Sequence, residues 1–134
     1  MDAVLDEIRS RAAADSPLWA AALLPGDPPA PEYEDRCAPP YLLGVEMIRE
    51  GYLLHHGRAR LFSQDDRDLA LLTGDYLYAA GLVEICSTGD LAAVATLAEL
   101  IAQCSLRRGD RVDDDDEALW ASSIASLGRD LALA

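Results

Sequence analysis

The sequence predicts an all-α fold, and three observations lead to that prediction. Alanine and leucine are the two commonest residues, 23 and 22 of 134, whereas valine and isoleucine together number only 10. Such a composition favours helices over strands. Apolar residues recur three or four positions apart along most segments, which indicates amphipathic helices. A chain of this length suits one domain, so we expect a single helical bundle, residues 1–134, of about six helices.

The first 40 residues are predicted to form a helical arm followed by an irregular connection. Residues 1–24 carry apolar side chains at helical spacing, interrupted at Ser16-Pro17. A serine followed by a proline is typical of a helix start, because the hydroxyl caps the helix and proline needs no N–H there. Residues 25–40 contain six of the seven prolines, which disfavours any regular element. The helical core is therefore expected within residues 41–134.

The core is expected to contain four helices. Residues 41–59 are apolar on several sides, which predicts a buried helix, and Gly51 within it predicts close approach of a neighbouring helix. Residues 63–66, Ser-Gln-Asp-Asp, resemble a capping box, so a second helix is expected over residues 64–86. A third follows from Leu91. The apolar stripe of the second helix is predicted to be Leu69, Leu72, Tyr76, Ala79, Val83 and Cys86, and that of the last helix Trp120, Ile124, Leu127 and Leu131.

Charge and composition argue against several classes of function. The formal net charge of −13 disfavours a nucleic-acid partner, because such proteins need clustered positive charge. No apolar run reaches the ~20 residues of a membrane span, and the acidic N-terminus is unlike a secretory signal. The three cysteines, Cys37, Cys86 and Cys104, are expected to be reduced thiols. We therefore expect a soluble cytoplasmic protein with no membrane span and no nucleic-acid partner.

One segment resembles a known enzyme family. Residues 70–79, ALLTGDYLYA, resemble the helix of trans-isoprenyl diphosphate synthases that carries Gly-Asp between apolar residues. Residues 41–55 resemble the preceding helix of that family, which ends in the aspartate-rich motif Asp-Asp-x-x-Asp that binds Mg²⁺ and the allylic diphosphate. Here the motif is degenerate, with His56, Gly57 and Arg60 in its place. The resemblance thus implies that the chain holds no metal or cofactor and is not an enzyme by itself.

Within that family, the pattern resembles a narrower group. A helical arm, a motif helix without its aspartates and an intact Gly74-Asp75-Tyr76 helix resemble the non-catalytic small subunits of two-component bacterial hexaprenyl and heptaprenyl diphosphate synthases. The resemblance covers residues 41–110. It implies a helical bundle like the N-terminal part of the isoprenyl diphosphate synthase fold. It also implies a regulatory subunit that docks on a catalytic polyprenyl diphosphate synthase chain, as a heterodimer or heterotetramer, and helps set product length.

Two sets of residues are expected to carry that function. The helix over residues 64–86 has more apolar surface than a small domain can cover by itself, so one flanking face is predicted to dock on the partner. The product of such a synthase is an apolar chain, and a partner subunit can supply part of the tunnel floor that stops its growth. The predicted interface is Leu71, Tyr78, Leu82 and Ile85, and the predicted tunnel floor is Met47, Tyr52, Leu72 and Tyr76.

Two alternative functions use the same residues differently. A homodimeric helical interaction or scaffold protein, derived from the same fold, would also need the uncovered apolar faces. An enzyme could use residues 113–117, because Asp113, Asp114 and Glu117 form Asp-Asp-x-x-Glu, a spacing able to bind Mg²⁺. Acidic residues at a helix N-terminus are the simpler interpretation of that run, since they suit the helix dipole.

Five further side chains have competing interpretations. His55 and His56, with Arg58 and Arg60, form the one dense basic spot of the sequence. They could contact a diphosphate held by a neighbouring subunit, or they could simply end a helix, where basic residues suit the dipole. For Asp75, in the middle of a helix, we prefer hydrogen bonding to an adjoining helix or backbone over catalysis.

Overall fold

The computed structural model describes residues 3–110 and 116–128, and these residues form six helices. Over this part of the chain the one strand-like feature is an isolated bridge between Leu23 and Phe62. The all-α prediction is therefore confirmed. The helices are α1 (Ala3–Asp15), α2 (Pro17–Ala22), α3 (Pro39–His56), α4 (Arg67–Cys86), α5 (Leu91–Gly109) and α6 (Glu117–Ser126).

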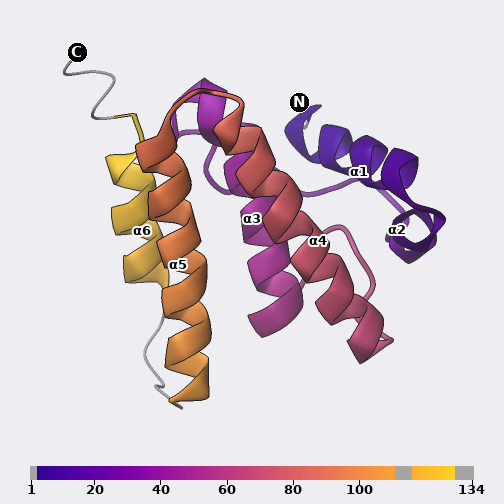
Figure 1. Ribbon diagram of the computed structural model, residues 1–134. Coiled ribbons are helices and arrows are strands. Elements are labelled where there is room, and N and C mark those ends of the chain that lie inside the picture. Colours follow the sequence, from indigo (N-terminus) through magenta and orange to yellow (C-terminus); the bar gives the residue numbers. More distant parts are fainter. Residues whose placement is uncertain (1–2, 111–115, 129–134) are drawn as a thin grey trace.

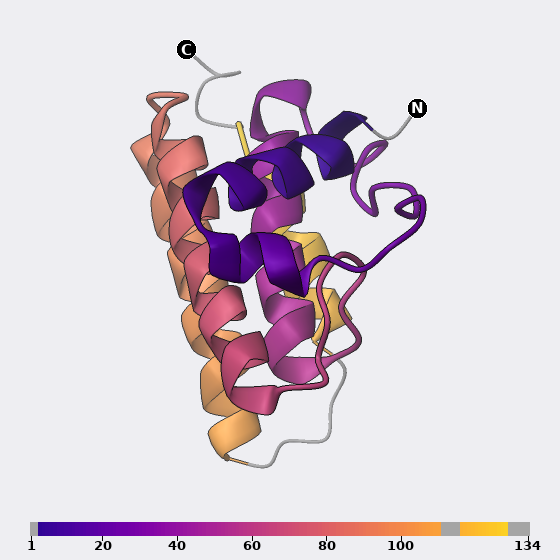
Figure 2. The ribbon, with the colours of Figure 1, turned by 90° about the vertical axis from the view of Figure 1, so that its right-hand side faces the viewer.

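Helix α3 lies at the centre of the molecule, and the other helices surround it. α4 runs alongside α3 and makes the most extensive of the helix–helix contacts. α5 and α6 lie on the side away from the N-terminal arm (Figure 1). The arm, α1 and α2, lies across the α3–α4 pair and is in the foreground of Figure 2. Because α3 is covered from several directions, 12 of its 18 residues are buried.

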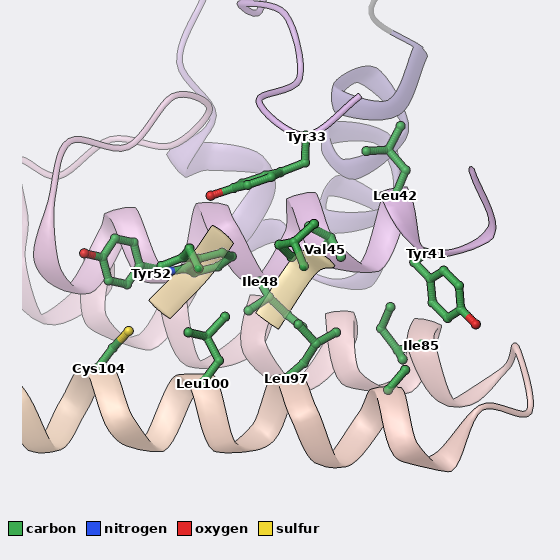
Figure 3. Close-up of a cluster of buried hydrophobic side chains, with 13 residues drawn as sticks. Tyr33, Tyr41, Leu42, Val45, Ile48, Tyr52, Ile85, Leu97, Leu100 and Cys104 are labelled. Carbon is green, nitrogen blue, oxygen red and sulfur yellow. The ribbon is translucent and has the colours of Figure 1, made fainter. Parts of the chain in front are cut away.

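Two apolar clusters fill the space on either side of α3. The first lies between α3, α5 and α6; Figure 3 shows Ile48 and Tyr52 of α3 facing Leu100 and Cys104 of α5. The second lies between α3, α4 and the arm, and it includes Leu77 of α4, which is fully buried. The central helix therefore contributes side chains to both clusters, which joins them into one molecule.

The helix starts agree with the sequence at two places and differ at a third. The Ser16 hydroxyl caps α2 by accepting from the Leu18 N–H, as predicted. Asp90 caps α5 by accepting from the Ala93 N–H. The predicted start of the second core helix near residue 64 is wrong, because Asp66, rather than Ser63, is the cap and α4 begins at Arg67.

The buried face of α4 also differs from the prediction. The residues that face α3 and the arm are mostly small: Ala70, Thr73, Gly74, Leu77, Gly81 and Ile85. Two residues of the predicted stripe, Leu72 and Val83, are instead 52% and 70% exposed. The stripe was wrong because α3 and α4 approach closely, and a close crossing places small residues at the contact and larger ones outside it.

Candidate functional site

The candidate site is the contact between α3 and α4, the two helices that carry the family resemblance. Four glycines lie at this contact and face one another in pairs. A Cβ atom added to Gly51 would lie 2.9 Å from the carbonyl oxygen of Gly74, and one added to Gly81 would lie 2.9 Å from that of Gly44. Such distances to backbone are too short for a side chain, so the crossing depends on glycine. The close approach predicted at Gly51 is confirmed.

Asp75 lies at the edge of this contact and faces α3. Its Oδ1 atom is 3.0 Å from Nε2 of His55, and the His55 ring stacks on Tyr78 with centroids 5.2 Å apart. The same ring fills the space above Gly74, where an added Cβ would lie 2.5 Å from His55 Cδ2. The Gly-Asp pair therefore seats the histidine, because the glycine makes room for the ring and the aspartate contacts its nitrogen. Asp75 thus contacts an adjoining helix, but His55 Nε2 makes no hydrogen bond to it, so the hydrogen bond preferred from sequence stays a prediction.

His56 is the last residue of α3, and Gly57 follows it as the C-cap. The His56 ring lies 5.3 Å from the Tyr52 ring, centroid to centroid. Burial lowers the pKa of His56 below its ordinary 6.5, and the nearby His55 and Arg108 lower it further. Burial thus disfavours the charged imidazolium, which makes His56 a poor group for binding a diphosphate.

Arg60 faces into the protein, so the predicted basic spot does not form as a surface. Its Nη1 atom lies 2.6 Å from Glu46 and its Nε atom 3.0 Å from Glu50, and both carboxylates are fully buried. The Arg60 side chain is only 9% exposed. The interpretation that Arg60 contacts a neighbouring subunit's diphosphate is therefore wrong for this structure, whereas Arg58 is exposed.

Glu46 and Glu50 are buried charged residues that the sequence interpretation missed. Glu50 accepts from the Leu61 N–H at 2.8 Å, and Glu46 accepts from the Tyr33 N–H at 2.8 Å. These two carboxylates hold the α3–α4 loop and the Pro-rich loop against the central helix. A signal was present, because two glutamates four residues apart on a largely apolar helix need a buried cation between them, and Arg60 follows nearby.

The acidic run at residues 113–117 is described only in part, since Asp113, Asp114 and Asp115 lie outside the described residues. Asp116 is fully buried and accepts from Arg107 at 2.9 Å and Arg108 at 2.7 Å. Glu117 accepts from Arg49 at 2.7 Å. Among residues 3–110 and 116–128, no group of three or more His, Cys, Asp or Glu side chains is placed to hold a metal ion.

The four predicted tunnel-floor residues do not come together. Met47 is buried in the cluster with the arm, whereas Tyr52 is buried in the cluster with α5 and α6. Tyr76 stacks on Trp19, and its hydroxyl donates to Asp15. These three side chains therefore make their contacts inside the chain. Leu72 alone of the four is largely exposed.

The predicted partner interface also lies mostly inside the chain. Ile85 is fully buried, and Tyr78 and Leu82 pack against the same cluster. The most exposed face of α4 carries Leu72 and Val83 instead, and Leu71 of the predicted interface is half-buried. Among the described helices, α4 alone is long and apolar enough to cross a membrane, by length and composition only, and 33% of its most apolar stretch is buried.

No family model, curated protein or solved structure matches this chain. The resemblance to isoprenyl diphosphate synthases therefore rests on the residues of the α3–α4 pair. What those residues build is a glycine crossing, a histidine seated by Gly74 and Asp75, and a buried set of charges around Arg60. These features fix the position of two helices relative to each other, and α4 presents its other face to the surroundings.

Proposed function

We propose that the chain is a non-catalytic regulatory subunit that docks on a catalytic polyprenyl diphosphate synthase chain through the outer face of α4. The observation that carries the proposal is the mismatch between the apolar character of α4 and its burial. Leu72 and Val83 are 52% and 70% exposed, and Ala79 and Cys86 are exposed on the same side. An apolar face of this kind is typical of a protein interface, because leaving it in water is unfavourable.

A protein partner explains this face better than a lipid bilayer does. Asp75 lies near the middle of α4, and its side chain is 66% exposed. In a membrane span that carboxylate would lie near the centre of the hydrocarbon, which costs about 2.5–3.5 kcal/mol on insertion scales. Beside a protein it can lie at the rim of the interface, where water or a partner side chain solvates it.

The choice of partner rests on the resemblance of the α3–α4 pair to the synthase helices. In an active synthase the end of the first helix would carry the metal-binding aspartates, whereas here that end carries His56 and Gly57. A chain with this end needs a second chain for the chemistry. Leu72 remains the one predicted tunnel-floor residue on the outer face, so we propose that it is the residue through which this subunit shortens the product.

The test is the product length made by a reconstituted complex. A full-length trans-prenyl diphosphate synthase chain from the same genome is mixed with this chain, Mg²⁺, an allylic diphosphate and isopentenyl diphosphate. We expect no turnover by this chain alone, and Leu72→Ala should lengthen the product by at least about one isoprene unit, because it deepens the tunnel.

Leu106→Ala is the matched control for that test. Leu106 is 56% exposed on α5, outside the proposed face, so its truncation should leave product length unchanged. A product that is indifferent to the presence of this chain would contradict the proposed function. A product that depends on the chain but not on Leu72 would remove the tunnel-floor role and leave docking alone.

A further inference from the structure

Helix α6 is held in the molecule by a small number of specific contacts. It is ten residues long, and only Trp120 and Ile124 are buried. It covers the apolar cluster between α3 and α5 from the outside, on the far side of the molecule from the arm (Figure 1). Figure 3, with the front of the chain cut away, shows the α3 and α5 side chains that line the seat beneath it.

Trp120 is the apolar anchor of α6 and lies in an aromatic cage. Its ring stacks on Tyr33 at 5.8 Å and meets Tyr52 edge-on at 5.3 Å, centroid to centroid. The Arg49 guanidinium lies 4.9 Å from the Trp120 ring centroid. Cys104 lies in the same cluster, and burial raises its pKa to about 11. A cage of this composition recognises one aromatic side chain, by stacking and by cation–π attraction.

The acidic N-terminus of α6 is held by arginines around the cage. Asp116 forms ion pairs with Arg107 and Arg108, and Glu117 forms one with Arg49. Arg36 lies on the other side, 4.5 Å from the Tyr33 ring centroid. These arginines are 4 of the 11 Lys and Arg residues in a chain of net charge −13, so the seat gathers positive charge on an acidic protein, although Arg49 also pairs with Glu32.

Hollows that open to solvent flank α6 on both sides. A cavity of about 400 Å³ lies between α5 and α6, lined by Leu100, Gln103 and Leu119 among others. A second cavity of about 250 Å³ lies on the opposite flank, lined by Tyr33, Arg36 and Ile124 among others. Both hollows open to solvent at the surface, and a longer or bulkier helix could fill them with further contacts.

We propose that this seat is a docking groove for an acidic helix of a partner protein that carries one aromatic anchor, and that α6 occupies it as an internal competitor. We infer what the groove recognises from three features of α6: an acidic first turn, one buried aromatic ring and a short apolar face. A partner helix that presents the same features and fills the flanking cavities displaces α6. Because α6 must leave first, the apparent affinity for the partner is reduced by the fraction of closed grooves.

The groove is tested with a synthetic peptide of the α6 sequence, residues 116–128, labelled with fluorescein and followed by anisotropy. The full chain carrying Trp120→Ala has an emptied cage, and it should bind the peptide at least about tenfold more tightly than the wild-type chain does. Trp19→Ala is the matched control, because Trp19 is also buried but belongs to the cluster with the arm. It should bind the peptide as weakly as the wild type.

Charge supplies a second arm of the same experiment. Replacing Asp116 by Asn and Glu117 by Gln in the peptide should weaken binding to the Trp120→Ala chain, because the arginines then face neutral groups. Added salt should weaken the unmodified peptide, since part of its attraction is electrostatic. A folded Trp120→Ala chain that binds the peptide no better than the Trp19→Ala chain overturns the proposal.

Thiol labelling keeps the proposal testable if Trp120→Ala does not fold. In a chain with Cys37→Ser and Cys86→Ser, the buried Cys104 reacts only when α6 leaves its seat or the whole protein unfolds. We expect Cys104 to react at least about tenfold faster than a cysteine introduced as Ala70→Cys in the other cluster. The rate of Cys104 labelling should also change little at low urea concentrations, because release of α6 alone exposes little surface. Equal rates, rising together with urea, would show that α6 leaves only on global unfolding and would overturn the proposal.

Discussion

At the scale of single residues, the protein is organised by charges placed inside it. Glu46 and Glu50 are fully buried on α3, and Arg60 lies between them. Each carboxylate also accepts a backbone N–H from a loop, so the same groups that neutralise one another fix loop positions. An apolar helix would pack as well but would not specify where those two loops lie.

Removing Arg60 should therefore be strongly destabilising. Arg60→Ala leaves two carboxylates buried without a cation, which typically costs about 3–5 kcal/mol. Urea unfolding followed by circular dichroism measures the loss. Arg58→Ala is the control, because Arg58 is exposed, and it should change stability by less than about 0.5 kcal/mol. Similar effects of both substitutions would show that the buried charges do not hold the loops.

Asp90 gives the fold an acid-sensitive contact. The Tyr41 hydroxyl donates to Asp90 at 2.7 Å, and this bond, with the Ala93 N–H, holds the pKa of Asp90 below its ordinary 3.8. A carboxyl with a lowered folded-state pKa stabilises the fold above its unfolded pKa, and that contribution is lost as pH falls through the folded value.

Tyr41→Phe tests that contact directly. The substitution should move the carbon-13 NMR titration midpoint of the Asp90 carboxyl upward, toward 3.8. The stability difference between wild type and Tyr41→Phe should be constant from about pH 5 to 7, where the Asp90 carboxyl is ionised in both the folded and the unfolded chain, and should shrink as the pH falls below about 4. A midpoint that stays in place after the substitution contradicts the assignment of its cause.

At the scale of helices, the sequence predicts which elements exist better than it predicts which faces they bury. Composition, prolines and caps located all six helices, because those signals are local. The buried face of α4 was predicted wrongly, since the large residues Leu72 and Val83 lie outside and Gly74 and Gly81 lie inside. Helical periodicity cannot separate a face that packs closely through small residues from one that packs through large ones. The buried glutamates were missed for a related reason, because their partner Arg60 lies on a loop.

The glycine crossing predicts opposite outcomes for two glycine-to-alanine substitutions. At Gly81 an added Cβ would meet the Gly44 carbonyl oxygen at 2.9 Å, so Gly81→Ala should destabilise by about 1–3 kcal/mol through overpacking. At Gly109, on the last turn of α5, nothing lies within 4 Å, so Gly109→Ala should stabilise by about 0.4–1 kcal/mol. Urea unfolding of both variants measures whether each substitution lowers or raises the free energy of unfolding. A neutral Gly81→Ala would mean that α3 and α4 can separate freely.

At the scale of the whole molecule, two apolar clusters share α3, and we propose that two surfaces bind partners. One is the outer face of α4, which carries Leu72 and Val83 in the open. The other is the cationic seat of α6, which the protein fills from within. The two surfaces belong to different helices, α4 and α6. A partner bound to one surface therefore leaves the other surface accessible to a second partner. The sequence predicted an apolar excess in α4; of the residues named for it, Leu72 lies on the exposed face, whereas Tyr78, Leu82 and Ile85 pack inside the chain.

Docking through α4 can be measured by sedimentation velocity of this chain mixed with a catalytic polyprenyl diphosphate synthase chain. We expect a complex that sediments faster than either chain. Val83→Asp should weaken it at least about tenfold and Leu106→Asp should leave it intact, because only the first substitution buries an unpaired charge at the interface. A wild-type chain that pairs only with itself would favour the homodimeric scaffold. A complex that tolerates Val83→Asp as well as it tolerates Leu106→Asp would contradict docking through α4.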